Sequence, residues 1–170
     1  NIAIFIGSEL ESGGRYQCEY KVLDILKKYH KDQGINLKFY GLREKVKKDY
    51  IDLNLDINII KENIFQKLHR YSLSHFLFYN IFSKIKMGLS SIEKQLANEQ
   101  IDLVYFLGPD IVSHGLTNIP YIFTLWDLGH LDILEFPEIS YDGMFDLREF
   151  TNTRSLKKSY KVIVDLEWGK

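Results

Sequence analysis

The chain opens on a continuous apolar run, Ile2-Ala3-Ile4-Phe5-Ile6, which ends at Gly7-Ser8. A run that is apolar at every position suits a strand buried on both faces, as in a parallel sheet covered by helices. Helical spacing of apolar residues then predicts a helix from about residue 15 to about residue 31. We expect that helix to bury Cys18, Val22, Ile25, Leu26 and Tyr29.

The next part of the chain predicts one more strand and several helices. Residues 37–40 predict a second strand, and a strand–helix–strand unit favours parallel pairing through a right-handed crossover. Residues 41–57 show a weak pattern and predict mostly loop. Asn58 is a candidate N-cap for a helix with one apolar face. That face would carry Ile60, Ile64, Leu68 and Tyr71.

A second helix, from about Ser74 to Met87, is apolar nearly all round, which is typical of a buried helix or of one that covers a neighbouring domain or a membrane surface. The apolar pattern continues through Ile85, Leu89, Ile92 and Leu96, so Gly88 is expected to mark a kink. Residues 103–107, 121–125 and 162–164 predict three further strands, the last preceded by a helix near residues 148–159. This alternation predicts an α/β fold: a Rossmann-like, doubly wound, mainly parallel sheet of five or six strands.

Composition excludes several classes of protein. Of the 170 residues 45% are hydrophobic, which is enough for a core. The 22 basic and 23 acidic side chains leave a net charge of -1, which argues against a protein built to bind nucleic acid. A single cysteine excludes a disulfide framework and a multi-cysteine zinc site, and it is compatible with a cytoplasmic location. No signal peptide is visible at the start of the sequence.

Ligands of doubly wound sheets bind beyond the carboxyl ends of the strands. Four segments follow such ends here: Gly7-Ser8, Gly108-Pro109-Asp110, Trp126-Asp127 and Asp165. Glycine and aspartate are also ordinary turn formers, so each segment has a purely structural interpretation as well.

The first loop lacks the dinucleotide and P-loop fingerprints but has Gly13 and Gly14 followed by Arg15 at the start of a helix. Glycines and a helix N-terminus allow a phosphate to approach backbone N–H groups, and arginine adds a bidentate contact. A flexible surface turn is the alternative.

Asp127 and His130 leave a strand end within four residues. Such a pair can transfer a proton, clamp sugar hydroxyls or bind a metal. Glu135 and Glu138 are the candidates for a third ligand, but no paired-histidine motif is present, so we predict no metal site. Trp126 is interpreted as a core aromatic residue.

Taken together, these features resemble the N-terminal domain of group 1 glycosyltransferases, retaining enzymes of GT-B fold. The resemblance covers most of residues 1–170, except about 41–100. It rests on the first strand with its delayed diglycine loop, and on the following segments: Pro120-Tyr121-Ile122-Phe123-Thr124-Leu125-Trp126-Asp127-Leu128-Gly129-His130, Phe136-Pro137-Glu138, Arg148-Glu149 and residues 160–170.

The resemblance implies that the chain is the acceptor-side half of a two-domain enzyme, with the donor-binding C-terminal domain lying beyond residue 170. Such an enzyme transfers a sugar from a nucleotide-sugar donor to a saccharide or lipid-linked acceptor with retention, as in polysaccharide biosynthesis, and needs no cofactor. This half alone is then expected to be inactive. Catalysis would involve Asp127 and His130, donor binding Gly13, Gly14 and Arg15, and acceptor binding Ser8, Asp110 and Glu138.

Two positions depart from the family pattern. Trp126 stands where many members have a histidine, and Leu166 stands where a serine is common. The first departure leaves open which side chain meets the donor sugar. The helix predicted at 74–87 would line the acceptor cleft, contact the inner face of the membrane, or lie buried in the domain.

Two other functions remain open from the residues themselves. One is a metal-dependent hydrolase that uses Asp127, His130 and Glu138. The other is a non-catalytic binding domain of flavodoxin-like form.

Overall fold

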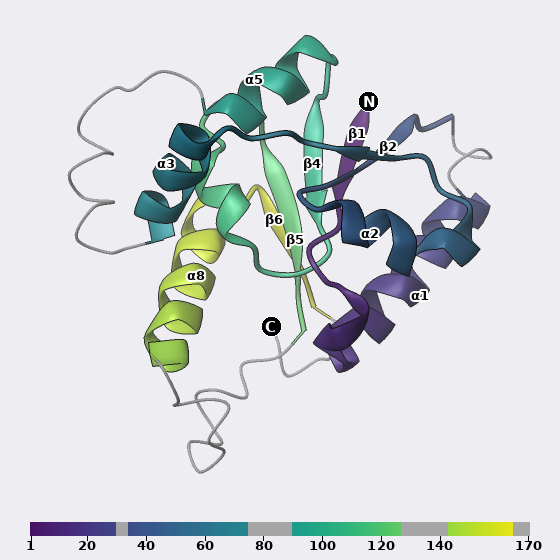
Figure 1. The fold of residues 1–170 in the computed structure, drawn as a ribbon, viewed down its shortest axis with the longest axis horizontal. Helices are drawn as coiled ribbons and strands as arrows, with labels where there is room; N and C mark the ends of the chain where they lie inside the picture. The colour runs from purple at the N-terminus through teal and green to yellow at the C-terminus, as the bar shows by residue number, and fades with distance from the viewer. Residues whose placement is uncertain (30–33, 75–89, 127–142, 165–170) are drawn as a thin grey trace.

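A computed structural model describes residues 1–29, 34–74, 90–126 and 143–164. Its centre is a six-stranded sheet whose strand pairs are all parallel, in the order β3-β2-β1-β4-β5-β6 (Figure 1). The strands are β1 (Ile2–Phe5), β2 (Leu37–Gly41), β3 (Ile57–Ile59), β4 (Leu103–Phe106), β5 (Tyr121–Leu125) and β6 (Lys161–Val164). The predicted Rossmann-like, doubly wound parallel sheet is therefore confirmed.

Helices cover both faces of the sheet. The longer ones are α1 (Gly14–Tyr29), α2 (Glu44–Asp49), α3 (Ile64–Ser74), α5 (Ser91–Asn98) and α8 (Met144–Lys158), and short 3-10 helices lie at η1 (Leu10–Ser12), η3 (Ile51–Leu53) and η4 (Ile111–Gly115). In Figure 1, α1 and α2 lie on one side of the sheet, and α3, α5 and α8 on the other. No described helix has the length and apolar character needed to cross a lipid bilayer.

The apolar strands contribute side chains to two cores, because successive side chains of a strand point to opposite faces of the sheet. Along β1, Ala3 and Phe5 face one core, while Ile4 and Ile6 face the other. The first core is completed mainly by α5 and η4, and the second by α1, α2 and η3. This arrangement explains why the first strand is apolar at every position.

The predicted buried stripe of α1 is confirmed in part, because Val22 and Leu26 pack against the second core, whereas Ile25 is 54% exposed and Cys18 is only partly buried. Among the described side chains of this helix, the buried ones are Tyr16, Glu19 and Leu23. The prediction followed apolar residues alone. It therefore missed the buried carboxylate of Glu19 on the core-facing side of α1.

The segment from residue 41 to residue 71 is more ordered than predicted. Helix α2 occupies part of the expected loop, and its one buried side chain is Val46. The prediction that Asn58 caps a helix is wrong, because Asn58 lies within β3. Helix α3 starts later, at Ile64, and leaves Ile64 and Leu68 exposed instead of buried.

The prediction that helical structure continues unbroken into Ile92 and Leu96 is wrong at Ser90, and the kink predicted at Gly88 lies outside the described residues. Ser90 caps α5, since its side chain accepts a hydrogen bond from the N–H of Glu93, so a new helix begins there. The helix predicted over residues 74–87 falls almost entirely outside the described residues.

Candidate functional site

The loops that follow β1 and β4 meet at the carboxyl edge of the sheet, as the sequence predicted. A Cβ atom added to Gly7 would lie 2.6 Å from Nη2 of Arg15 and 2.8 Å from Oδ2 of Asp110. A Cβ on Gly108 would lie 3.2 Å from Nε1 of Trp126 and 3.4 Å from Nε of Arg15. The two glycines thus provide the space in which the Arg15 guanidinium lies.

The diglycine segment lies open at the start of α1. Gly13 has a φ of 60°, a conformation that other residues rarely adopt, and Gly14 is the first residue of the helix. A Cβ on either glycine would meet nothing within 4 Å. The first N–H groups of a helix have no intrahelical acceptor, so this end of α1 is accessible and attracts anions.

Arg15 is held by two carboxylates. Its Nε donates to Oε1 of Glu19 at 2.9 Å, and its Nη2 lies 3.9 Å from Oδ2 of Asp110. Burial by itself lowers the pKa of Arg15, but the charges of Glu19 and Asp110 outweigh it and raise the pKa above its ordinary value. The guanidinium is therefore a permanent cation whose charge is already balanced within the protein.

Glu19 is the residue of this site that the sequence did not reveal. It is fully buried, and its Oε2 accepts hydrogen bonds from the backbone N–H groups of Gly7 and Ser8, at 3.3 and 3.1 Å. The hydroxyl of Tyr50 lies 3.5 Å from the same oxygen. The spacing of Arg15 and Glu19, four residues apart on one helix, was the available sequence signal.

Ser8 lies beneath the site. Its hydroxyl is buried and lies 2.8 Å from the hydroxyl of Tyr50. Burial raises the pKa of Tyr50, so this phenol stays protonated. A direct contact of Ser8 with an acceptor stays a prediction, and its position here favours a role in holding the loop after β1.

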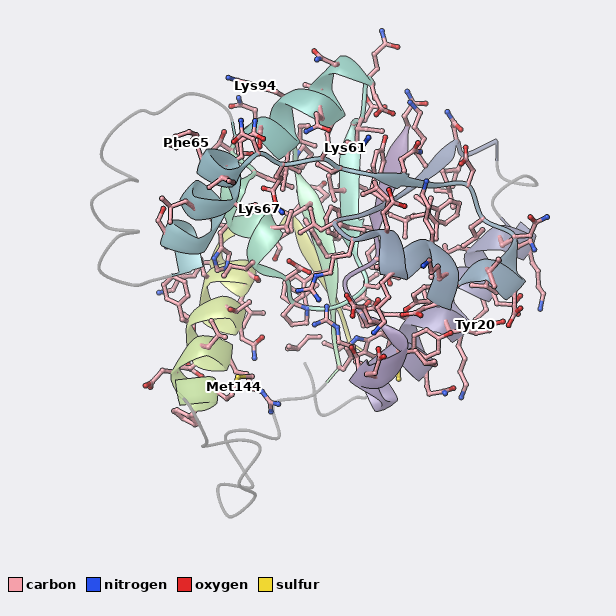
Figure 2. All side chains as sticks on the ribbon, viewed as in Figure 1. Tyr20, Lys61, Phe65, Lys67, Lys94 and Met144 are labelled. Carbon is pink, nitrogen blue, oxygen red and sulfur yellow. The ribbon has the colours of Figure 1, made fainter. Side chains whose placement is uncertain are left out.

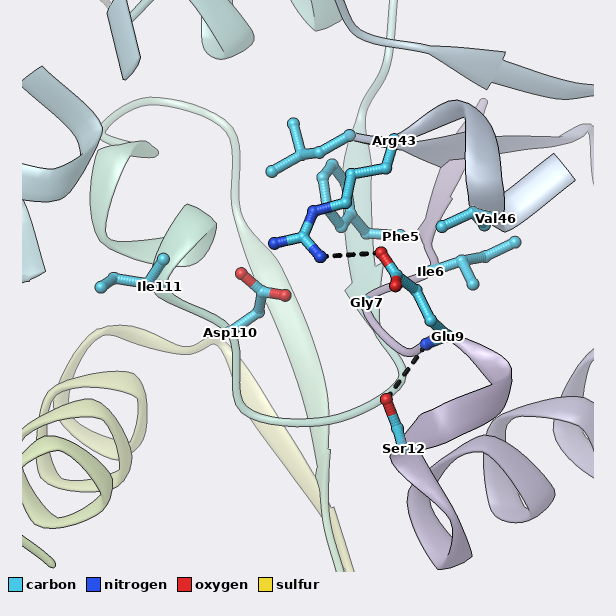
Figure 3. Close-up of a pocket in the computed structure, with 10 residues that line it drawn as sticks. Phe5, Ile6, Gly7, Glu9, Ser12, Arg43, Val46, Asp110 and Ile111 are labelled. Atoms are coloured by element: carbon cyan, nitrogen blue, oxygen red, sulfur yellow. Dashed lines mark hydrogen bonds and ion pairs between the residues drawn. The ribbon is translucent and has the colours of Figure 1, made fainter. Parts of the chain in front are cut away.

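A cavity of about 260 Å³ opens beside these loops (Figure 3). Its polar lining comes from Glu9, Ser12, Arg43 and Asp110. Glu9 accepts from Nη1 of Arg43 at 2.8 Å and lies 3.4 Å from Nζ of Lys45. The hydrogen bond from Arg43 is the main reason that the pKa of Glu9 is lowered. Leu42 and Arg43 also line a second cavity, of about 480 Å³, together with Lys61 and Lys67.

Trp126 directly follows β5 and is half-buried, so the prediction of a core aromatic residue is confirmed only in part. Its Nε1 is buried and finds no hydrogen-bond acceptor among the described residues. An indole N–H therefore lies beside Gly108.

Three predicted site residues, Asp127, His130 and Glu138, lie outside the described residues. Within the described ranges, no group of three or more histidine, cysteine, aspartate or glutamate side chains is arranged to hold a metal ion. The hydrolase alternative depends on the three residues that are not described, so it stays open.

Comparison with known proteins supports the fold. Over 96% of its length, the chain superposes on the crystal structure of MurG from Acinetobacter baumannii with a TM-score of 0.50 and 13% sequence identity. The matched part is 41% of the MurG chain. This chain therefore has the fold of one GT-B-like half. No protein-family model matches the sequence, and no curated protein does.

Proposed function

We propose that this chain is the acceptor-side half of a glycosyltransferase. The observation that carries the proposal is the meeting of Gly7, Arg15, Gly108 and Asp110 beside a cavity, at the sheet edge where doubly wound folds bind ligands. The GT-B-like fold supports it, because the structural neighbour MurG is a glycosyltransferase.

The reaction proposed is transfer of a sugar from a nucleotide-sugar donor to a saccharide or lipid-linked acceptor, with retention at the anomeric carbon. Gly13 and Gly14 leave room for the donor diphosphate at the open N-terminus of α1. The carboxylate of Asp110 accepts hydrogen bonds from hydroxyl groups of the acceptor sugar in the cavity. Asp127 and His130 would complete the catalytic centre, and most donor contacts would come from a second domain.

A complete polypeptide is needed to test this proposal. We would incubate the full product of the gene with UDP-, GDP- and dTDP-sugars, with and without a lipid-linked saccharide fraction extracted from membranes, and measure nucleoside diphosphate release. We expect acceptor-dependent release with at least one donor, and NMR of the product should show a retained anomeric configuration. If none of the donors gives nucleoside diphosphate release, the proposal is refuted. A product with inverted anomeric configuration would refute retention.

Variants assign the catalytic roles. Asp127→Ala and His130→Ala are expected to abolish transfer. Asp102→Ala is a matched control, because Asp102 is exposed and directly precedes β4, at the end of the sheet opposite the carboxyl edge. Unchanged transfer in either test variant would remove that residue from the centre. Tight nucleotide binding by this chain alone would favour the non-catalytic binding domain instead.

A cytoplasmic enzyme acting on a lipid-linked acceptor would work at a membrane surface, and α3 offers an apolar face for that contact. Ile64 and Phe65 are 81% exposed, and Figure 2 shows Phe65 at the end of the molecule that also carries Lys61 and Lys94. Apolar side chains among lysines suit a peripheral contact with anionic lipid. We expect the chain to sediment with phosphatidylglycerol vesicles and Phe65→Ser to sediment less. Equal sedimentation of both would contradict a role for this face.

A further inference from the structure

Glu19 has no role in the function proposed above, yet it is the most completely enclosed charged group of the site. A buried carboxylate is costly unless hydrogen bonds compensate it. Here Oε1 accepts from Nε of Arg15, and Oε2 accepts from the backbone at the end of β1. Glu19 therefore fixes Arg15 relative to the sheet.

Arg15 in turn occupies the crevice of the Rossmann unit. In the order β3-β2-β1-β4-β5-β6, the chain direction across the sheet reverses between β1 and β4, which is where such folds form a crevice. The guanidinium lies against Gly7 at the end of β1 and against Gly108 at the end of β4. A ligand at this edge has to bind next to the guanidinium, because the protein's own side chain fills the space.

The far end of this guanidinium faces Asp110. Oδ2 of Asp110 lies 3.9 Å from Nη2 of Arg15, and Oδ1 accepts from the N–H of Val112 at 2.9 Å. Both oxygens thus have a partner that restricts the rotation of the carboxylate. Asp110 also lines the 260 Å³ cavity, where Figure 3 shows its carboxylate near Gly7.

The charges around Arg15 indicate what it can bind. Two carboxylates, Glu19 and Asp110, surround one guanidinium, so the three side chains together carry a net negative charge. Such a group repels a diphosphate and accepts hydrogen bonds from hydroxyls. Arg15 is therefore better placed to orient Asp110 than to contact the donor diphosphate.

We propose that Glu19 is a positioning residue that holds Arg15 in the crevice between β1 and β4, and that Arg15 thereby orients Asp110 to bind hydroxyl groups of an uncharged saccharide acceptor. The inference rests on the proposed function and names the acceptor class for its cavity. It assigns neighbouring residues to different substrates, because Gly13 and Gly14 would contact the donor while Arg15 would support acceptor binding.

The test uses the complete enzyme and the same lipid-linked saccharide fraction. We expect Asp110→Asn and Glu19→Gln each to raise the apparent KM for acceptor about tenfold or more, since each weakens a hydrogen bond to a charged group. The KM for donor and the slow hydrolysis of donor by water should stay unchanged. Because both variants act on one chain of contacts, the double variant should resemble Asp110→Asn alone.

Two further variants keep the test decisive. Arg15→Lys retains the charge but loses the guanidinium fork that spans both carboxylates, so it should raise the acceptor KM even if Glu19→Gln fails to fold. Glu11→Gln is the matched control, because Glu11 is an exposed carboxylate of the same loop that pairs with Lys45. It should leave both KM values unchanged.

The contact between Arg15 and Glu19 can also be measured without enzyme activity. In the 170-residue chain, the Nε–H of Arg15 should give a slowly exchanging NMR signal, and Glu19→Gln should lose it. Absence of that signal from the native chain, or an unchanged acceptor KM in both Glu19→Gln and Arg15→Lys, would overturn the positioning role. Failure of the native enzyme to transfer any sugar would instead overturn the proposed function, and the acceptor assignment with it.

Discussion

The carboxylate of Glu93 accepts both the backbone N–H and the hydroxyl of Thr117, at 2.8 and 2.7 Å. The next two N–H groups, of Asn118 and Ile119, also donate to it, at 2.5 and 3.0 Å. Glu93 is fully buried on α5, so this one side chain satisfies the backbone of the turn that leads into β5.

Replacing this carboxylate should destabilise the fold at neutral pH. Glu93→Gln keeps an oxygen for the three N–H groups that bond Oε1 but replaces a charged acceptor with a neutral one, so we expect a loss of about 1–3 kcal/mol in the free energy of unfolding. Chemical denaturation monitored by circular dichroism measures it. Glu44→Gln, at the exposed start of α2, should cause no comparable loss. Equal effects of the two changes would contradict this account of the turn.

The carboxylate of Glu93 also predicts how the stability of the fold changes at acidic pH. Burial by itself raises the pKa of Glu93, but the hydrogen bonds from Asn118, Thr117 and Ile119 outweigh it and lower the pKa. A carboxylate whose pKa is lowered in the folded state stabilises the fold at pH values above the ordinary pKa of glutamate. That stabilisation is lost as the pH falls through the folded-state pKa. The difference in stability between the native chain and Glu93→Gln should therefore shrink on acidification. A pH-independent difference would contradict the prediction.

Helix α1 allows a direct test of which face is buried. Leu23 is fully buried, whereas Ile25 is 54% exposed. We expect Leu23→Ala to lower the free energy of unfolding by about 2–5 kcal/mol, because it removes packed methyl groups and leaves a cavity. Ile25→Ala should change it by less than about 0.5 kcal/mol. Thermal unfolding of both variants measures the contrast, and the reverse order would restore the stripe inferred from apolar spacing.

The glycines at the carboxyl edge should tolerate substitution differently. Gly7→Ala places a Cβ 2.6 Å from Nη2 of Arg15, so the guanidinium has to move, at a cost of roughly 1–3 kcal/mol. Gly14→Ala enters open space at the first turn of α1 and should stabilise the chain by about 0.5 kcal/mol. Denaturation midpoints compare the two, and a harmless Gly7→Ala would show that Arg15 is not confined there.

The buried tyrosines predict that the fold loses stability at alkaline pH. Burial raises the pKa of Tyr50, Tyr105 and Tyr121. A raised folded-state pKa contributes stability that is complete below the ordinary tyrosine value of about 10 and is lost as pH rises above it. We expect tyrosinate absorbance from these residues to appear together with loss of the circular dichroism signal. Gradual ionisation of all tyrosines in a folded chain would contradict this.

Strand positions could be predicted from the sequence because buried parallel strands are apolar throughout. The runs that became β1, β4 and β5 illustrate this, and their order with the helices was enough to predict the sheet class. Strand β3 is only three residues long, and its middle residue is Asn58, so neither length nor composition marked it. Helix α2 buries a single side chain, Val46. With one buried residue, its sequence shows no repeated helical spacing of apolar residues, so it could not be predicted.

The site could be predicted only as far as strand-end chemistry reaches. The rule that parallel strands share one carboxyl edge brings Gly7, Gly108 and Asp110 together from the sequence alone. It could not predict that Arg15 would turn inward, because that depends on Glu19, and a fully buried carboxylate looks like an ordinary surface residue in the sequence. The roles of Asp127, His130 and Glu138 stay predictions.

Strand β1 lies in the middle of the sheet, between β2 and β4, although it comes first in the chain. Its residue Ile2 is in register with Leu37 on one side and with Leu103 on the other. The second pairing closes a loop of about a hundred residues, and contacts so distant in sequence are slow to form. During synthesis, one edge of β1 therefore stays unpaired until the ribosome has released β4, about a hundred residues later, so the centre of the sheet cannot close before that point.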